Sequence, residues 1–130
     1  SLSWQTILAV GLGGFLGAIT RVYVTHTMNL SIKSDFPWGV LTVNIIGSFL
    51  IGILFAVFLH YTVSDTLKAF LTSGFLGALT TYSTFAMESY FLFNTSLFLA
   101  ASNMFLNLFG TIVAAGSGYK LLSFLLSKLL

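Results

Sequence analysis

Four long stretches of apolar residues, separated by short polar segments, run along this chain. They cover about residues 5–27, 38–60, 66–93 and 97–126, and each is long enough to cross the ~30 Å hydrocarbon core of a bilayer as a helix. The segments between them contain residues that favour turns and helix starts, such as proline, asparagine and serine. The pattern predicts an all-α integral membrane protein with four transmembrane helices in a single domain, residues 1–130.

The composition agrees with this interpretation and excludes several classes of protein. Charged residues are 6% of the 130 residues, against roughly a quarter in soluble domains, and hydrophobic residues are 57%. There is no cysteine, so disulfides and thiol chemistry are excluded. The five basic residues are scattered and predict no nucleic-acid surface. We find no nucleophile–base pair or metal-ligand cluster, so the chain is not expected to be an enzyme.

Small residues in the first two stretches predict close helix packing. Gly13 and Gly17 are four residues apart and therefore share one helical face, where another helix can approach closely. Arg21 continues the same face one step further. In the second stretch, Asn44 and Ser48 are four residues apart and form a polar face, and Gly47 lies beside it.

The third stretch contains a cluster of hydroxyl groups that is unusual for a simple membrane anchor. Glycine and threonine residues at 77–81 predict a break in the helix, because glycine weakens it and threonine hydroxyls can satisfy the backbone groups that a break frees. Directly after this cluster, Tyr82 and Phe85 are three residues apart and lie on neighbouring positions of one helical face. Polar groups deep in a bilayer tend to mark a path for a substrate or an ion.

The fourth stretch has a polar stripe formed by Asn103, Asn107 and Thr111, which recur every four residues. Such a stripe is typical of an ion pathway, but it also serves as hydrogen-bonding contact between helices. Asn103 and Asn107 are therefore interpreted either as pore residues or as residues that pack a dimer. Arg21 lies about one turn from its helix end, where pairing with a helix C-terminus is a structural interpretation.

The distribution of positive charge gives almost no preference for one orientation in the membrane. With the N-terminus in the cytoplasm, that side holds Lys68, Lys120 and Lys128, and the other side holds Lys33 and Arg21. Three against two is a very small bias under the positive-inside rule. We therefore hypothesise that the chain inserts in both orientations and pairs head-to-tail.

Three motifs resemble the Fluc (CrcB) family of bacterial fluoride channels, and together they cover nearly the whole chain. They are Gly13-Gly14-x-x-Gly17-Ala18-x-x-Arg21, Trp38-Gly39-x-Leu41-x-Val43-Asn44-x-x-Gly47-Ser48-Phe49 and Gly74-Phe75-x-Gly77-x-x-Thr80-Thr81-Tyr82-Ser83-Thr84-Phe85. The resemblance implies an antiparallel, dual-topology homodimer in the lipid bilayer of the bacterial inner membrane. It also implies two fluoride pores per dimer, export of cytoplasmic fluoride, and a structural sodium ion at the dimer interface.

The resemblance also assigns roles to single residues. The backbone carbonyls of Gly77 and Thr80 are implied to hold the sodium ion, and Arg21 matches an arginine near the pore entrance. Two features depart from the usual family pattern: Tyr82 stands where phenylalanine is usual, and asparagines stand where the fourth helix usually has tyrosine and serine. The implied fluoride pore consists of Asn44, Tyr82, Ser83, Thr84, Phe85, Asn103 and Asn107.

The chemistry of these residues suits a fluoride pore better than either of two alternative functions. Amides and hydroxyls replace the water of the anion without a fixed charge that would retain it, and aromatic rings have positive edges. A small dual-topology multidrug or cation transporter needs a carboxylate within the membrane. Acidic residues are missing from the first, second and fourth stretches, and Glu88 comes late in the third. The other alternative is a non-transporting subunit whose polar stripes only hold helices together.

Overall fold

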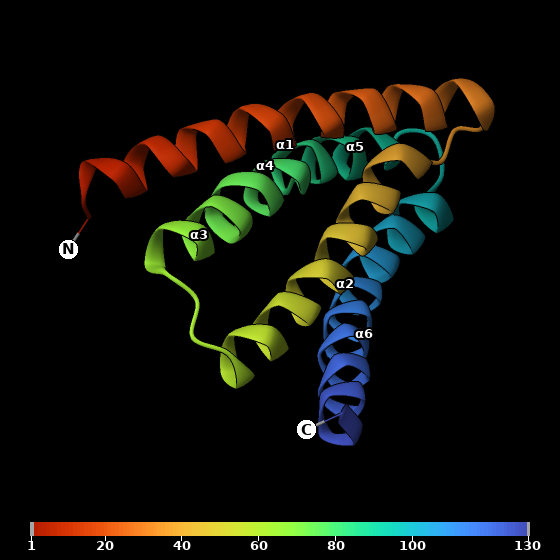
Figure 1. Cartoon of the computed structure of the whole chain (residues 1–130). Helices are drawn as coiled ribbons and strands as arrows, with labels where there is room; N and C mark the ends of the chain where they lie inside the picture. Colours follow the sequence, from red (N-terminus) through yellow and green to blue (C-terminus); the bar gives the residue numbers. More distant parts are fainter. Residues whose placement is uncertain (1, 130) are drawn as a thin grey trace.

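A computed structural model describes residues 2–129, and this part of the chain is helical apart from short connections (Figure 1). Residue 126, where the last helix was expected to end, lies inside a helix that continues to Leu129. The elements, in chain order, are α1 (Trp4–Ser31), α2 (Trp38–His60), α3 (Asp65–Ala69), η1 (Phe70–Leu76), α4 (Gly77–Leu79), α5 (Ser83–Leu92) and α6 (Leu97–Leu129).

Three of these helices, α1, α2 and α6, are long and apolar enough to cross a membrane by themselves. The remaining expected helix is jointed: α3, η1 and α4 follow one another without interruption, and α5 continues the path after a break. Ser64 caps the start of this series, since its hydroxyl accepts a hydrogen bond from the Leu67 N–H at 3.2 Å. The π-helix η1 was not foreseen from the sequence.

The break lies at the threonine end of the predicted range 77–81. Gly77 keeps a helical backbone (φ −61°, ψ −33°). The helix leaves this conformation at Thr80, whose ψ is 158°, and resumes at Ser83. The helix therefore ends at Thr80 and not at Gly77. The Leu76 carbonyl accepts from both the N–H and the hydroxyl of Thr80, at 3.1 and 3.0 Å, and closes the last turn.

The helices form two packed layers that cross at a steep angle (Figure 1). In one layer α1 lies along η1 and α4, and in the other α2 lies along α6. Glycines permit both contacts: Gly13 and Gly17 of α1 are buried against the backbone of η1, and Gly52 and Gly118 are buried between α2 and α6. A β-carbon at any of these four positions would collide with a carbonyl oxygen of the facing helix.

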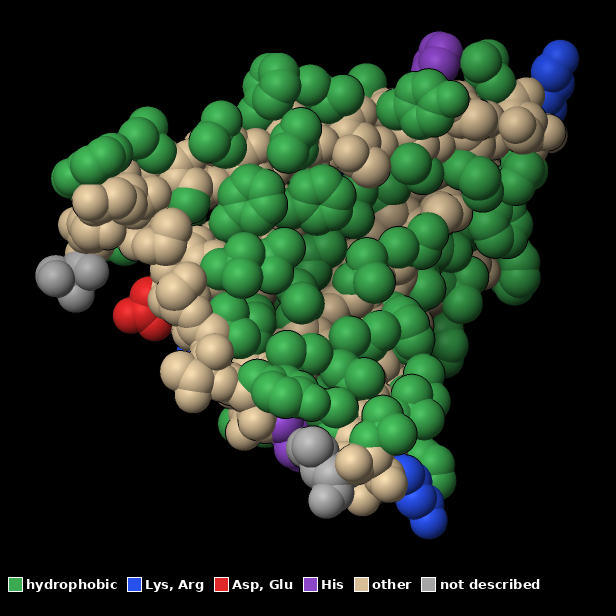
Figure 2. All heavy atoms as spheres, in the orientation of Figure 1, with side chains coloured by type: hydrophobic (Ala, Val, Ile, Leu, Met, Phe, Trp, Pro, Cys, Tyr) green, Lys and Arg blue, Asp and Glu red, His purple; other side chains and the backbone are tan. Residues whose placement is uncertain are grey.

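The surface is mainly apolar, as expected for a protein in a bilayer. Figure 2 shows hydrophobic side chains over almost the whole visible face, with basic side chains at its corners. Large side chains such as Phe15, Phe98 and Phe105 are exposed in the single chain. The buried apolar core is small and centres on Val43, Leu76 and Leu79, close to the break. Most of the large apolar side chains therefore lie on the outer surface of the single chain rather than in its interior.

Candidate functional site

The break after α4 is stabilised by one side chain of α2. The Thr81 N–H donates to Asn44 Oδ1 at 2.8 Å, and Asn44 Nδ2 donates to the Thr81 carbonyl at 3.1 Å. Asn44 is buried, with 8% of its surface exposed. A backbone group removed from water needs a hydrogen-bond partner, and a break leaves such groups without their helical partners. Asn44 supplies both partners for Thr81 and thereby allows the chain to open at this point.

Two further side chains support the ends of the broken helix. Arg21 of α1 donates from Nε to the Ala78 carbonyl at 2.9 Å, where α4 ends. On the other side, the Thr84 N–H donates to Thr81 Oγ1 at 3.3 Å, which gives the first turn of α5 an acceptor. A cation at a helix C-terminus is favourable because the carbonyls there carry partial negative charge. Arg21 therefore has a structural contact, ten residues before α1 ends at Ser31.

A chain of buried amides connects this break to α6 and α5. Asn44 Nδ2 donates to Asn107 Oδ1 at 2.9 Å, and Asn107 Nδ2 donates to Asn103 Oδ1, also at 2.9 Å. Asn103 Nδ2 in turn donates to Ser89 Oγ at 2.9 Å. The polar stripe of the fourth stretch thus lies inside the helical bundle of a single chain, where its amides bond to one another.

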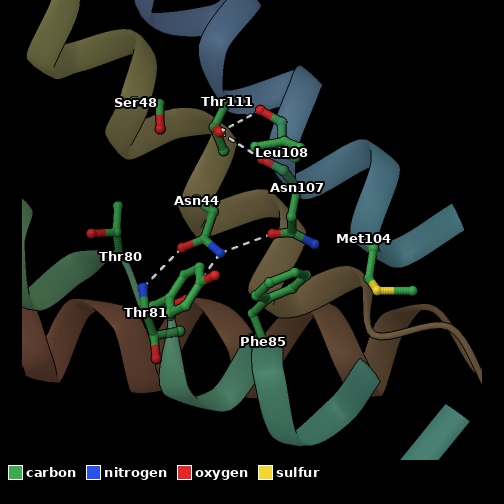
Figure 3. Close-up of a pocket in the computed structure, with 10 residues that line it drawn as sticks. Asn44, Ser48, Thr80, Thr81, Phe85, Met104, Asn107, Leu108 and Thr111 are labelled. Carbon is green, nitrogen blue, oxygen red and sulfur yellow. Dashed lines mark hydrogen bonds between the residues drawn. The ribbon is translucent and has the colours of Figure 1, made fainter. Parts of the chain in front are cut away.

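A cavity of about 470 Å³ lies beside the break, between α2, α5 and α6. In Figure 3, Asn44 and Asn107 meet across it, with the Phe85 ring below them and Thr80 and Thr81 at one side. None of the residues that line the cavity carries a formal charge. They combine amides, hydroxyls, aromatic rings and apolar groups: Asn44, Ser48, Thr80, Thr81, Tyr82, Phe85, Met104, Asn107, Leu108 and Thr111.

Tyr82 and Phe85 form an aromatic pair at the mouth of this cavity. Their ring centroids are 5.5 Å apart and the ring planes are inclined by 49°. Phe85 is half-buried, whereas Tyr82 is 81% exposed in the single chain. The inclined arrangement turns ring edges, which are electropositive, toward neighbouring space. The pair can therefore present weakly positive edges to an anion without contributing a charge.

The structure brings together some of the residues expected from the sequence and separates others. Ser83 and Thr84 are exposed at the start of α5 and do not line the cavity. Asn103 is fully buried behind it, with none of its surface exposed. Two partners were not singled out as site residues: Thr81, whose backbone Asn44 holds, and Ser89. The threonine pair that follows Gly77 could have pointed to Thr81, whereas no sequence pattern predicts the contact between Ser89 and Asn103.

Comparison with known proteins identifies the family. The sequence profile described as "CrcB-like protein, Camphor Resistance (CrcB)" matches residues 8–119. The chain belongs to the CrcB family. It is 51% identical over 120 residues to a protein of Sulfurimonas denitrificans, a match that covers 91% of this chain and 93% of the relative. It is 44% identical over 121 residues to a protein of Nautilia profundicola, covering 92% and 94% of the two chains. Both are named "Fluoride-specific ion channel FluC".

Membership of the CrcB family confirms several predictions at once. A Campylobacter jejuni relative with the same name is 41% identical over 116 residues, which cover 88% of this chain and 95% of that protein. The family resemblance seen in the three motifs is correct, and the four-helix, multi-pass membrane fold of a bacterial channel family is confirmed. The named relatives are channels, so the expectation that this CrcB protein is not an enzyme is also confirmed.

Proposed function

We propose that this CrcB family protein is a fluoride-selective channel that lets cytoplasmic fluoride leave the cell across the inner membrane. The observation that carries the proposal is the uncharged polar cavity beside the helix break, in a chain whose relatives are named fluoride-specific ion channels. Asn44, Asn107 and the pair Tyr82–Phe85 line this cavity. They are the groups that we propose for contact with the passing anion.

Neutral groups suit rapid passage of a small, strongly hydrated anion. Conduction requires sites that replace water and yet release the ion, which a fixed positive charge would hinder. The Asn44 amide already donates to the Thr81 carbonyl and to Asn107. An arriving fluoride ion therefore accepts a hydrogen bond from the Asn44 amide in place of one of these acceptors. When the ion leaves, the original hydrogen bond forms again. This exchange keeps binding weak, because every hydrogen bond made to the ion replaces one within the protein.

We further propose that two chains assemble as an antiparallel homodimer with two pores. The exposed Tyr82 supports this assembly, because a single chain leaves the aromatic pair without cover on one side. Ser83 and Thr84, exposed at the same end of α5, belong to the proposed pore in the assembled dimer. The near balance of positive charge between the two sides of the membrane also supports insertion in both orientations.

The backbone near the break fits the sodium ion that the family resemblance implies. Among residues 2–129, the carbonyl oxygens of Gly77 and Thr80 accept no hydrogen bond, since the Thr81 N–H bonds to Asn44 and the Thr84 N–H to Thr81 Oγ1. Hard cations prefer oxygen ligands. In the proposed dimer, Gly77 and Thr80 of both chains hold the sodium ion at the interface, where it adds a fixed positive field near the pores.

The alternative of a multidrug or cation transporter has no support in the cavity. Coupled cation exchange needs a carboxylate at the binding site, and the cavity lining includes none. Glu88 lies instead beside a second cavity of about 310 Å³, near the loop between α1 and α2. No observation favours the transporter over the channel.

The first test is efflux of fluoride from liposomes that contain the purified protein. Liposomes are loaded with fluoride or chloride, valinomycin balances the charge, and ion-selective electrodes follow each anion. We expect rapid loss of fluoride and no loss of chloride. Equal loss of both anions would contradict selectivity, and no loss of either would leave a membrane protein whose polar residues only join helices.

A further inference from the structure

Ser89 on α5 and Asn103 on α6 form a buried polar pair outside the proposed ion pathway. They are 5% and 0% exposed, and Asn103 Nδ2 donates to Ser89 Oγ at 2.9 Å. Neither residue lines the cavity. Because Asn103 is completely removed from solvent, its amide depends on protein groups for hydrogen bonds. Among residues 2–129, Ser89 Oγ is the one acceptor of Asn103 Nδ2.

Hydrogen bonds connect this pair to the helix break, and each donor in the series lies on the side of the break and each acceptor on the side of Ser89. Asn107 Nδ2 donates to Asn103 Oδ1 and to the Asn103 carbonyl, each at 2.9 Å. Asn44 Nδ2 donates to Asn107 Oδ1, and Asn44 Oδ1 accepts from the Thr81 N–H. Two backbone groups determine this direction, since the Asn103 carbonyl can only accept and the Thr81 N–H can only donate. The backbone thus fixes the orientations of Asn44 and Asn107, and Asn103 follows through its bond with Asn107.

None of the three side-chain amides, Asn44, Asn103 and Asn107, can turn over by itself. If Asn103 turned, its Nδ2 would face Nδ2 of Asn107, and two donors cannot bond to each other. Turning Asn107 would transfer the same conflict to Asn44, and turning Asn44 would direct its Nδ2 at the Thr81 N–H. That last group belongs to the backbone and cannot reverse. The orientation of Asn103, behind the cavity, is therefore coupled to that of Asn44, which lines it.

We propose that Ser89 is a positioning residue for fluoride conduction, an inference that rests on the channel function proposed above. Ser89 accepts the Asn103 Nδ2 hydrogen that no other described group takes, and so holds the side chain to which Asn107 donates. Without the hydroxyl, Asn103 Nδ2 is a buried donor without a partner, and any movement of Asn103 that relieves this displaces Asn107, which donates to Asn103 and accepts from Asn44. Asn44 and Asn107, the two amides proposed to contact the anion, are then no longer held in one conformation.

The test compares fluoride efflux from liposomes for the unaltered protein, Ser89→Ala and the control Ser123→Ala. Ser123 lies on α6, and its buried Oγ has no hydrogen-bond partner among the described residues. We expect Ser89→Ala to lower the efflux rate about tenfold, the scale of one unsatisfied buried donor, and Ser123→Ala to leave it unchanged. Equal rates for Ser89→Ala and the unaltered protein would overturn the inference.

A second background separates positioning from a general loss of structure. In Asn107→Ser, a hydroxyl replaces the amide that links Asn103 to Asn44. If Ser89 acts through Asn107, adding Ser89→Ala to this background changes the efflux rate by less than about twofold, because coupled residues are not additive. If Ser89→Ala slows efflux by the same factor in both backgrounds, it acts by another route and the inference is wrong.

Two further comparisons keep the result interpretable. If Ser89→Ala does not fold, Ser89→Cys replaces it, because the thiol has nearly the same size and is a weak acceptor. Efflux between the rates of the unaltered protein and about one-tenth of it supports the inference, and an unchanged rate contradicts it. Absence of fluoride efflux from the unaltered protein would instead contradict the proposed function itself, and the inference would fall with it.

Discussion

Asn44 meets the helix break with both halves of its amide, so a single residue has two tasks. Its Oδ1 and Nδ2 hold the N–H and the carbonyl of Thr81, and the remaining Nδ2 hydrogen is directed to Asn107. A serine or threonine at this position has one donor and could not do both. The Asn44 amide therefore stabilises the break and also lines the cavity. A change at Asn44 is expected to affect both the backbone at Thr81 and the proposed conduction.

At Tyr82, the ring and the hydroxyl are expected to differ in importance. The ring lies beside Phe85, whereas the hydroxyl has no hydrogen-bond partner among residues 2–129, and the residue is 81% exposed. We expect Tyr82→Phe to keep the fluoride efflux rate within about twofold and Tyr82→Leu to lower it about tenfold, since only the second change removes the ring edge. Chloride efflux measured in parallel reports selectivity. A rate for Tyr82→Leu equal to that of Tyr82→Phe would remove the ring edge from the proposed pathway.

At the scale of elements, α1 and the jointed third helix are in close contact. Gly13 and Gly17 face backbone atoms of η1, and Arg21 reaches the end of α4 from the same side of α1. The π-helical turn widens η1 where it meets these glycines, and such turns are frequent at functional sites. The position of α4, and with it the position of the break, thus depends on how closely α1 can approach.

We therefore expect Gly17→Ala to destabilise the protein by about 1–3 kcal/mol, the usual range for overpacking. A β-carbon at Gly17 collides with the Phe75 carbonyl oxygen, a backbone atom that cannot turn aside. Gly11→Ala is the matched control, because nothing lies within 4 Å of a β-carbon there. Thermal unfolding in detergent measures both variants. Equal unfolding temperatures for the two would show that α1 can move away from η1 at little cost.

At the scale of the whole molecule, the exposed apolar surface and the sparse charges determine how the chain sits in a membrane. Charged residues are 6% of the sequence, and basic side chains gather at the ends of the molecule in Figure 2. An apolar exterior of this kind belongs in lipid or against another chain. The small charge bias between the two sides leaves the orientation undecided, which suits an antiparallel pair.

This view predicts that the chain is inserted in both orientations. Reporter fusions at the C-terminus should show cytoplasmic and external locations in comparable amounts. Adding two lysines to the loop between α2 and α3 should shift the population to one orientation and abolish fluoride efflux, because the positive-inside rule then acts strongly. Coexpression with a chain biased the other way should restore efflux. A single location for the unaltered chain would contradict dual topology.

Much of the fold follows from the sequence, for reasons that are local. Helix α2, from Trp38 to His60, coincides with its predicted limits, because an uncharged apolar run after a proline is unambiguous in a bilayer. The helix break at Thr80 and Thr81 falls within the predicted range 77–81, at its threonine end. Whether glycine or threonine ends the helix depends on which carbonyls and amides find partners, and those partners come from other helices.

The sequence by itself determined the class of protein, the number of membrane-crossing segments and the residue types available to a pore. Composition and periodicity suffice for these properties, because transfer from water into lipid depends on each segment alone. Only the tertiary structure decided that Asn103 is buried away from the cavity, that Ser89 holds it and that Asn44 holds Thr81. Hydrogen bonds between residues far apart in the chain depend on how the helices cross, and no local pattern specifies that crossing.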